Sequence, residues 1–227
     1  MNRRSFLKRS SVAALLAVGE WSGLTKVFAQ SENDNGEGKV MANTEKKNDM
    51  EHREASARSI RRAHAVCPLS AVQSEYAIWW REPETKIFPT LEELGIGFVP
   101  YCPLGRAFLT GVINEDSRFK QGDRRWNLPQ FTPDALKHNM PLVALVRKWA
   151  ERKGITPAQF ALVWMLSRKP WIAPIPGTTN PAHLDELMGA GTVRLSAWEM
   201  EEFDKEYARI DLMGHRADPF TESQIDK

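Results

Sequence analysis

The sequence predicts an α/β fold built on a parallel sheet. Short apolar segments alternate with helical ones along most of its 227 residues. Three segments have the pattern of buried strands: 69–76, 96–101 and 171–175. Helical segments separate them, and parallel strands need such crossover connections. With 42% hydrophobic residues, the chain is long enough for one sizeable globular domain.

The first 29 residues have the pattern of an export signal. Arg3 and Arg4 precede Phe-Leu-Lys, an apolar segment follows over 12–18, and the small side chain of Ala29 suits a cleavage site. This pattern resembles a twin-arginine signal, which implies export of a folded chain to the periplasm or another extracytoplasmic space. An uncleaved anchor is the alternative, but the apolar segment is too short for a stable membrane span.

Charge and composition divide the rest of the chain. Five basic side chains and one acidic side chain give residues 1–29 a charge of +4, so the total of +2 leaves the remainder at −2. This balance argues against a nucleic-acid partner. Residues 30–53 are polar and predict a disordered linker. We expect the folded part over 54–212 and a tail over 213–227.

Helix-start and helix-stop signals locate the helices. Ala57, Ile60 and Ala63 have helical spacing, and residues 83–94 predict one helix that Gly95 ends. Later helices are expected to start at capping signals, which are Thr132 with Pro133, the capping box 156–159, Asn180 with Pro181, and the capping box 196–199.

The turn at Gly177, Thr178 and Thr179 follows the third predicted strand and precedes a helix. Backbone N–H groups and the positive end of the helix dipole point toward such a turn, so an anion such as a phosphate would be stabilised there. An ordinary strand-to-helix turn is the alternative, because Gly-Thr-Thr is a weak signal.

The cysteines and histidines give no sign of a metal or disulfide site. Cys67 and Cys102 fall before one predicted strand and after the next, roughly 20 Å apart, which exceeds the reach of a disulfide. The five histidines are scattered singly, without metal-ligand spacing. The long polar segment 102–131 is typical of a functional or disordered loop.

Five blocks, taken in order, resemble the aldo-keto reductases, in the branch of the bacterial pyridoxal-type reductases and potassium-channel beta subunits. The blocks are IRRAHAV at 60–66, AVQSEY at 71–76, YCPLGR at 101–106, GITPAQ at 154–159 and IPGTTNP at 175–181. The resemblance covers roughly 54–208. It implies a TIM (β/α)8 barrel that binds a nicotinamide cofactor at the C-terminal ends of its strands. Here about the last three strands and their helices are present, which predicts a partial barrel.

The resemblance assigns cofactor roles residue by residue. It implies that Gln73 holds the nicotinamide carboxamide, since amide-to-amide pairing needs a donor and an acceptor, and that Tyr101 stacks on the ring. The other implied contacts are the pyrophosphate wrap of Cys102, Pro103, Leu104 and Gly105, the closing-loop Arg124, the adenosine-side phosphate turn of Gly177, Thr178 and Thr179, and the adenosine contacts of His183 and Glu186. Which arginine of Arg124 and Arg125 serves is left open. Rim packing for Tyr101 and simple burial for Cys102 are the alternatives.

Two departures bear on the cofactor. Leu187 stands where the family has an adenine-binding Asn. His183 stands where many members have Arg or Gln, and a histidine carries only part of a charge near neutral pH. The resemblance implies NADP as the cofactor, and NAD is possible because a histidine at 183 would neutralise a 2′-phosphate only weakly.

A larger departure concerns catalysis. The family's catalytic Asp, Tyr, Lys and His precede the helix matched by 60–66, and residues 1–53 contain no such motif. Tyr76 ends a strand, but no lysine or histidine is placed to lower its pKa. We therefore expect a chain inactive alone, which pairs with another chain or with itself through the open edge of strand 69–76. The alternative is a non-catalytic remnant that binds nucleotide weakly or only a partner.

Overall fold

The computed structural model describes residues 55–218, so the predicted export signal, the predicted linker and the last nine residues lie outside this range. The elements are α2 (Ala57–Val66), β1 (Ala71–Glu75), α3 (Pro83–Lys86), α4 (Phe88–Leu94), β2 (Gly97–Tyr101), η2 (Phe108–Thr110), η3 (Pro129–Phe131), α5 (Pro133–Arg152), α6 (Pro157–Arg168), α7 (Pro181–Met188), η4 (Gly189–Thr192) and α8 (Ala197–Tyr207). The predicted alternation of strands and helices is confirmed.

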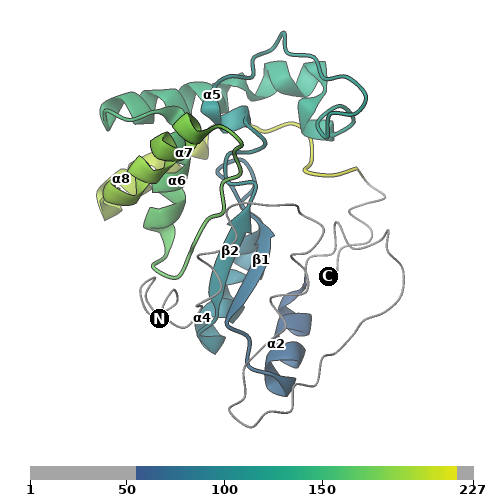
Figure 1. The fold of residues 1–227 in the computed structure, drawn as a ribbon, viewed down its shortest axis with the longest axis vertical. Helices are drawn as coiled ribbons and strands as arrows, with labels where there is room; N and C mark the ends of the chain where they lie inside the picture. The colour runs from purple at the N-terminus through teal and green to yellow at the C-terminus, as the bar shows by residue number, and fades with distance from the viewer. Residues whose placement is uncertain (1–54, 219–227) are drawn as a thin grey trace.

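The two strands form a parallel pair, and α3 and α4 make the crossover between them. The register runs from Ala71 beside Gly97 to Glu75 beside Tyr101. Figure 1 shows both strands ending at the same edge, from which the chain continues to η2 and α5. The carboxyl ends of β1 and β2 therefore lie together.

The third predicted strand, 171–175, is not a full strand. It makes one parallel bridge, between Ile172 and Phe98. The Phe98 N–H donates to the Trp171 carbonyl, and the Phe98 carbonyl accepts from the Ala173 N–H. Further along, Ile175 N–H donates to the Pro100 carbonyl at 3.1 Å. Proline has no N–H to return the next bond, so Pro100 interrupts the ladder. The segment follows β2 without becoming a regular strand.

The single helix predicted over 83–94 is wrong, because α3 and α4 are separate helices. Pro89 lies in the first turn of α4 and has no N–H to donate to a preceding carbonyl, so the first helix cannot continue through it. Gly95 ends α4 in the left-handed conformation at φ 66°, as predicted. The capping boxes that start α6 and α8 are also confirmed.

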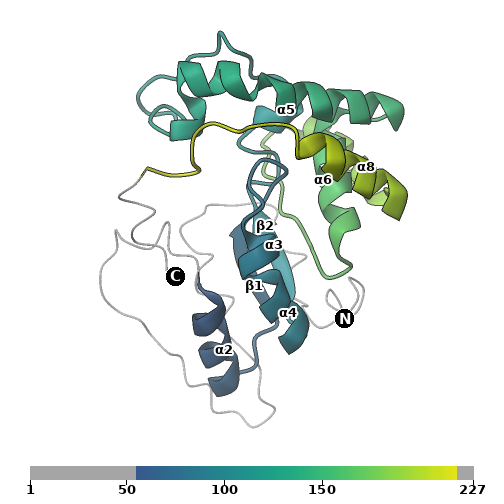
Figure 2. The same ribbon diagram turned by 180° about the vertical axis from the view of Figure 1, so that it is seen from behind.

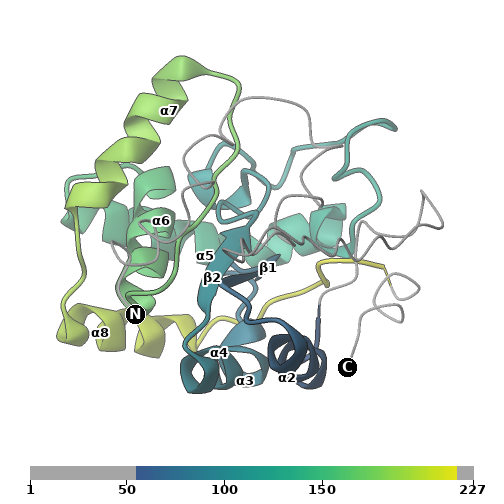
Figure 3. The same ribbon diagram turned by 60° about the horizontal axis from the view of Figure 1, so that its bottom comes forward.

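Helices cover one face of the sheet. Figure 2 shows α3 and α4 in front of the strands, and Figure 3 shows α2, α3 and α4 along one side of the sheet. Tyr76 lies at the centre of the buried aromatic core on this side, with ring centroids 5.2 Å from Phe88, 5.9 Å from Phe98 and 5.4 Å from Trp164. Among residues 55–218, no helix is long and apolar enough to cross a membrane.

Candidate functional site

The register sets the predicted nicotinamide residues on one face of the sheet. Side chains alternate along a strand, and Tyr76 and Phe98 both enter the aromatic core. Gln73 and Tyr101 therefore face the opposite side, one step apart diagonally, since Gln73 pairs with Val99 and Glu75 with Tyr101. Gln73 is exposed and its amide makes no hydrogen bond to the described residues. Both of its polar groups can therefore reach a ligand.

The predicted pyrophosphate loop follows β2 directly. Gly105 N–H donates to the Cys102 carbonyl at 2.9 Å, which closes a tight turn. Gly105 has φ +57°, and a Cβ there would lie 3.3 Å from Trp79 Cδ1, so both the backbone conformation and the close contact favour glycine at this position. Cys102, Arg106 and Ala107 also have positive φ, at 51°, 53° and 74°. The loop is thus a compact turn in an unusual backbone conformation.

A buried ion pair fixes this loop to the sheet. Arg106 Nη1 and Nη2 donate to the two carboxylate oxygens of Glu75 at 2.7 Å and 3.3 Å. Glu75 is only 2% exposed. No local pattern in the sequence indicates this pair, because Glu75 and Arg106 are 31 positions apart.

The cysteine in the loop is not poised for nucleophilic chemistry. Burial raises the pKa of the Cys102 thiol to about 11, with Arg106 and Arg124 opposing the shift and Glu75 adding to it. Both cysteines lie within the described residues as thiols, without a disulfide between them. No cluster of potential metal ligands occurs among residues 55–218.

The two arginines of the long loop, Arg124 and Arg125, lie in different surroundings. Arg125 forms an ion pair with Asp123 at 2.7 Å, packs over Phe119 and donates to the Arg106 carbonyl at 3.4 Å. Arg124 is exposed, and its charge reaches Cys102. Arg124 therefore lies close to the loop 102–107, next to the predicted pyrophosphate site.

The glycine turn lies at the same end of the sheet, because Ile175 is bonded to Pro100 next to the end of β2. Asn180 Oδ1 accepts from Ala182 N–H at 3.0 Å, so the predicted helix cap is confirmed and occupies one donor of the first turn. Asn180 N–H donates to the Thr178 hydroxyl at 3.1 Å. A Cβ on Gly177 would meet nothing within 4 Å, so the turn is open on that side.

The predicted adenosine contacts, His183 and Glu186, differ in their exposure and in their hydrogen bonds within the protein. His183 is exposed. Glu186 accepts a hydrogen bond from the Thr156 hydroxyl, and its carbonyl accepts from Gln159 Nε2 at 2.7 Å, which ties α7 to the start of α6. Leu187 is 6% exposed and belongs to the core. The side chain at 187 therefore serves packing.

Tyr76 lies on the helix-covered face, away from Gln73. Its hydroxyl donates to Glu84 Oε1 at 2.8 Å and its side chain is fully buried. Burial raises its pKa well above the ordinary value, with the charge of Glu84 as the next cause.

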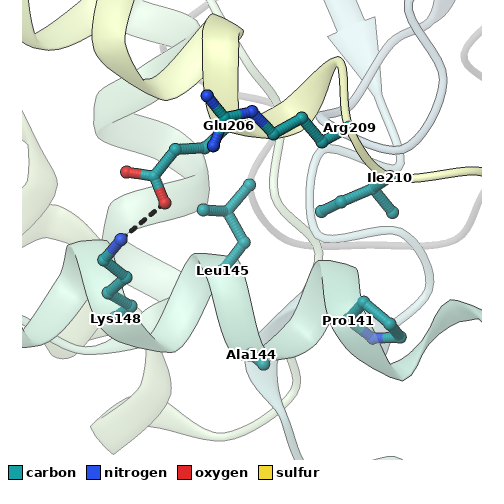
Figure 4. A pocket seen from close by; sticks show the side chains of 7 residues that line it. All are labelled: Pro141, Ala144, Leu145, Lys148, Glu206, Arg209 and Ile210. Carbon is teal, nitrogen blue, oxygen red and sulfur yellow. Dashed lines mark hydrogen bonds and ion pairs between the residues drawn. The ribbon is translucent and has the colours of Figure 1, made fainter.

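One shallow groove lies elsewhere, between α5 and the end of α8 (Figure 4). Pro141, Leu145 and Ile210 line it, and an ion pair between Lys148 and Glu206 closes one side. None of the predicted cofactor residues takes part in it.

Comparison with known proteins agrees with this architecture. The chain superposes on the glycerol dehydrogenase AKR11B4 from Gluconobacter oxydans with a TM-score of 0.65 and 26% identity, over 72% of this chain and 49% of that one. The thermostable aldo-keto reductase Tm1743, solved with the inhibitor epalrestat, gives 0.46 and 23% identity, over 66% and 45%. The chain thus spans about half the length of these structures. The model of the aldo/keto reductase family matches residues 52–208, so the chain belongs to that family.

Proposed function

We propose that the chain provides the cofactor-binding half of an NAD(P)H-dependent reductase of aldehydes or ketones, folded as part of a (β/α)8 barrel. The observation that carries the proposal is the exposed Gln73 on the same face as Tyr101, beside the loop 102–107 and the turn 177–179. Polar groups that converge at the carboxyl ends of parallel strands are typical of a cofactor site.

The residues present fit a nicotinamide dinucleotide. The cofactor supplies hydride when bound. Gln73 would orient the carboxamide through its donor and acceptor, and Tyr101 would support the ring. The 102–105 backbone and the 177–179 turn would hold the phosphates, with Arg124 and His183 adding positive charge. NADP is the proposed cofactor, with NAD possible.

The proton donor is proposed to come from another polypeptide. Carbonyl reduction needs a proton as well as a hydride. Tyr76 is buried and already donates to Glu84, so its hydroxyl is not available to a substrate. We infer that the catalytic half lies on a partner chain that pairs with the open edge of β1. A non-catalytic role in nucleotide or partner binding is the second candidate, supported by this engagement of Tyr76.

The proposed location is extracytoplasmic. The support is the twin arginine before a short apolar segment in residues 1–29. A fusion of these residues to a reporter that is active only after folded export tests this, with Arg3→Lys/Arg4→Lys as the control that should stop export.

Two measurements on the purified chain test the function. NADPH titration followed by tryptophan fluorescence should give a dissociation constant above about 1 μM, because the residues proposed to bind the cofactor form only one half of a pocket. Gln73→Leu, at an exposed position, should weaken binding without changing the melting temperature. Equal affinity in this variant would remove Gln73 from the site. NADPH oxidation by the chain alone with an aldehyde would overturn the need for a partner.

A further inference from the structure

We infer that Glu75 is a positioning residue for the cofactor: through its ion pair with Arg106 it holds the loop 102–107 in the conformation that faces the pyrophosphate. This inference rests on the proposed function for its ligand. The ordering of the loop by the pair, in contrast, is a property of the chain itself.

The geometry of the ion pair suits a rigid restraint on the loop 102–107. Two nitrogens of one guanidinium meet two oxygens of one carboxylate, at 2.7 Å and 3.3 Å, and the carboxylate is almost fully buried. A bidentate contact fixes the direction of the arginine as well as its distance. The sheet register holds Glu75 beside Tyr101. The ion pair therefore fixes the position of the loop relative to β1, the strand that carries Gln73.

The loop needs such a restraint. Cys102, Arg106 and Ala107 are all the non-glycine residues with positive φ in the range 55–218, and all lie in this one turn. Side chains with a Cβ disfavour that conformation, and it persists only where the surroundings determine it. Two contacts of Arg106 restrain the loop: its side chain donates to Glu75, and its carbonyl accepts from Arg125.

The position of the pair points to the ligand side. Glu75 shares its face with Gln73, whereas the half-buried carboxylate of Glu84 lies on the helix-covered side with Tyr76. Gly105, the residue before Arg106, supplies backbone to the proposed pyrophosphate wrap. A shift in Arg106 would therefore move the phosphate-binding backbone while leaving the aromatic core in place.

Amide hydrogen exchange and NADPH titration on the full chain test whether the Glu75–Arg106 pair holds the loop. The variant is Arg106→Lys, which keeps the charge but loses the fork, and the matched control is Arg168→Lys on the other face. Their side chains are 19% and 18% exposed. We expect exchange of the Gly105 and Leu109 amides to rise about tenfold in Arg106→Lys, and NADPH affinity to fall about tenfold. Arg168→Lys should lower the melting temperature but change neither quantity.

The outcomes separate the two claims. Wild-type exchange rates in Arg106→Lys would overturn the claim that the ion pair orders the loop. Faster exchange with unchanged NADPH affinity would overturn the positioning role. If the wild-type chain binds no NADPH, the proposed function fails, and the exchange comparison alone decides whether the pair orders the loop. Glu75→Gln is the second variant, with a larger expected effect on the same amides.

Discussion

Two neighbouring residues, Glu75 at the end of β1 and Tyr76 just after it, contact charged side chains on opposite faces of the sheet. On the helix-covered face, the Tyr76 hydroxyl meets Glu84, which shares Arg81 and Arg168 with Asp204. On the open face, Glu75 holds Arg106. The first cluster joins residues up to 123 positions apart, whereas the second spans 31.

This difference in reach indicates different roles. Glu84 and Asp204 link the segment before α3 to α6 and α8, and the arginine planes also pack over the Trp164 ring. The helix-side cluster therefore holds the fold together. The Glu75–Arg106 pair on the open face restrains one loop at the proposed site. Its loss should therefore change the loop 102–107 more than the rest of the fold.

The largest expected effect comes from Glu84→Gln. The change leaves Arg81 and Arg168 with one carboxylate between them, both largely buried, which should lower the free energy of unfolding by about 3–5 kcal/mol. Urea unfolding measures this. Glu93→Gln, in an exposed pair with Arg61, is the control and should leave stability unchanged. A loss no greater than the control's would mean that the cluster does not hold the helices together.

An intermediate effect is expected from Gly105→Ala on the open face. The left-handed φ and the nearby Trp79 should together cost about 1–2 kcal/mol, measured by the same unfolding experiment. Gly95→Ala has a similar φ of +66° but no atom within 4 Å of its Cβ, so it isolates the conformational part. Equal losses in the two variants would show that packing against Trp79 adds nothing.

A smaller effect is expected from Tyr76→Phe. The ring keeps its aromatic neighbours, and only the hydrogen bond to Glu84 is lost, so stability should fall by about 1 kcal/mol. Because burial raises the pKa of this hydroxyl, it stays protonated in the folded protein, and its contribution is present at neutral pH and lost only as the pH rises above the ordinary tyrosine value. The loss in Tyr76→Phe should therefore be constant from pH 6 to about 9. A loss that grew at acid pH would point to another group.

Local signals in the sequence predicted much of this fold. The two capping boxes, the cap at Asn180 and the stop at Gly95 depend on neighbours within four residues, and all are confirmed. The break at Pro89 was also local, but the apolar spacing of 83–94 concealed it. The third strand depended on a residue elsewhere in the chain, since Pro100 in β2 denies 171–175 a hydrogen bond.

The candidate site divides in the same way. Turn chemistry indicated 177–179 as a candidate phosphate turn, whereas Gln73 and Tyr101 were named through the resemblance to the aldo-keto reductases. The pairing of Glu75 with Arg106 and the contact of Thr156 with Glu186 join different elements, and no local pattern shows them. The register of β1 against β2 was needed to bring them into view.

The smallest expected effect on stability, and the sharpest on the ligand, comes from Gly177→Ala. The Cβ would meet no atom of the described protein within 4 Å and the backbone there is not left-handed, so unfolding should change by less than about 0.5 kcal/mol. A phosphate in the turn would meet that methyl group, and NADPH affinity should fall about tenfold. Gly191→Ala, equally open but outside the turn, is the control for fluorescence titration. If both variants bind NADPH like the wild type, the turn is an ordinary connection and the ligand contacts lie only along β1 and the loop after β2.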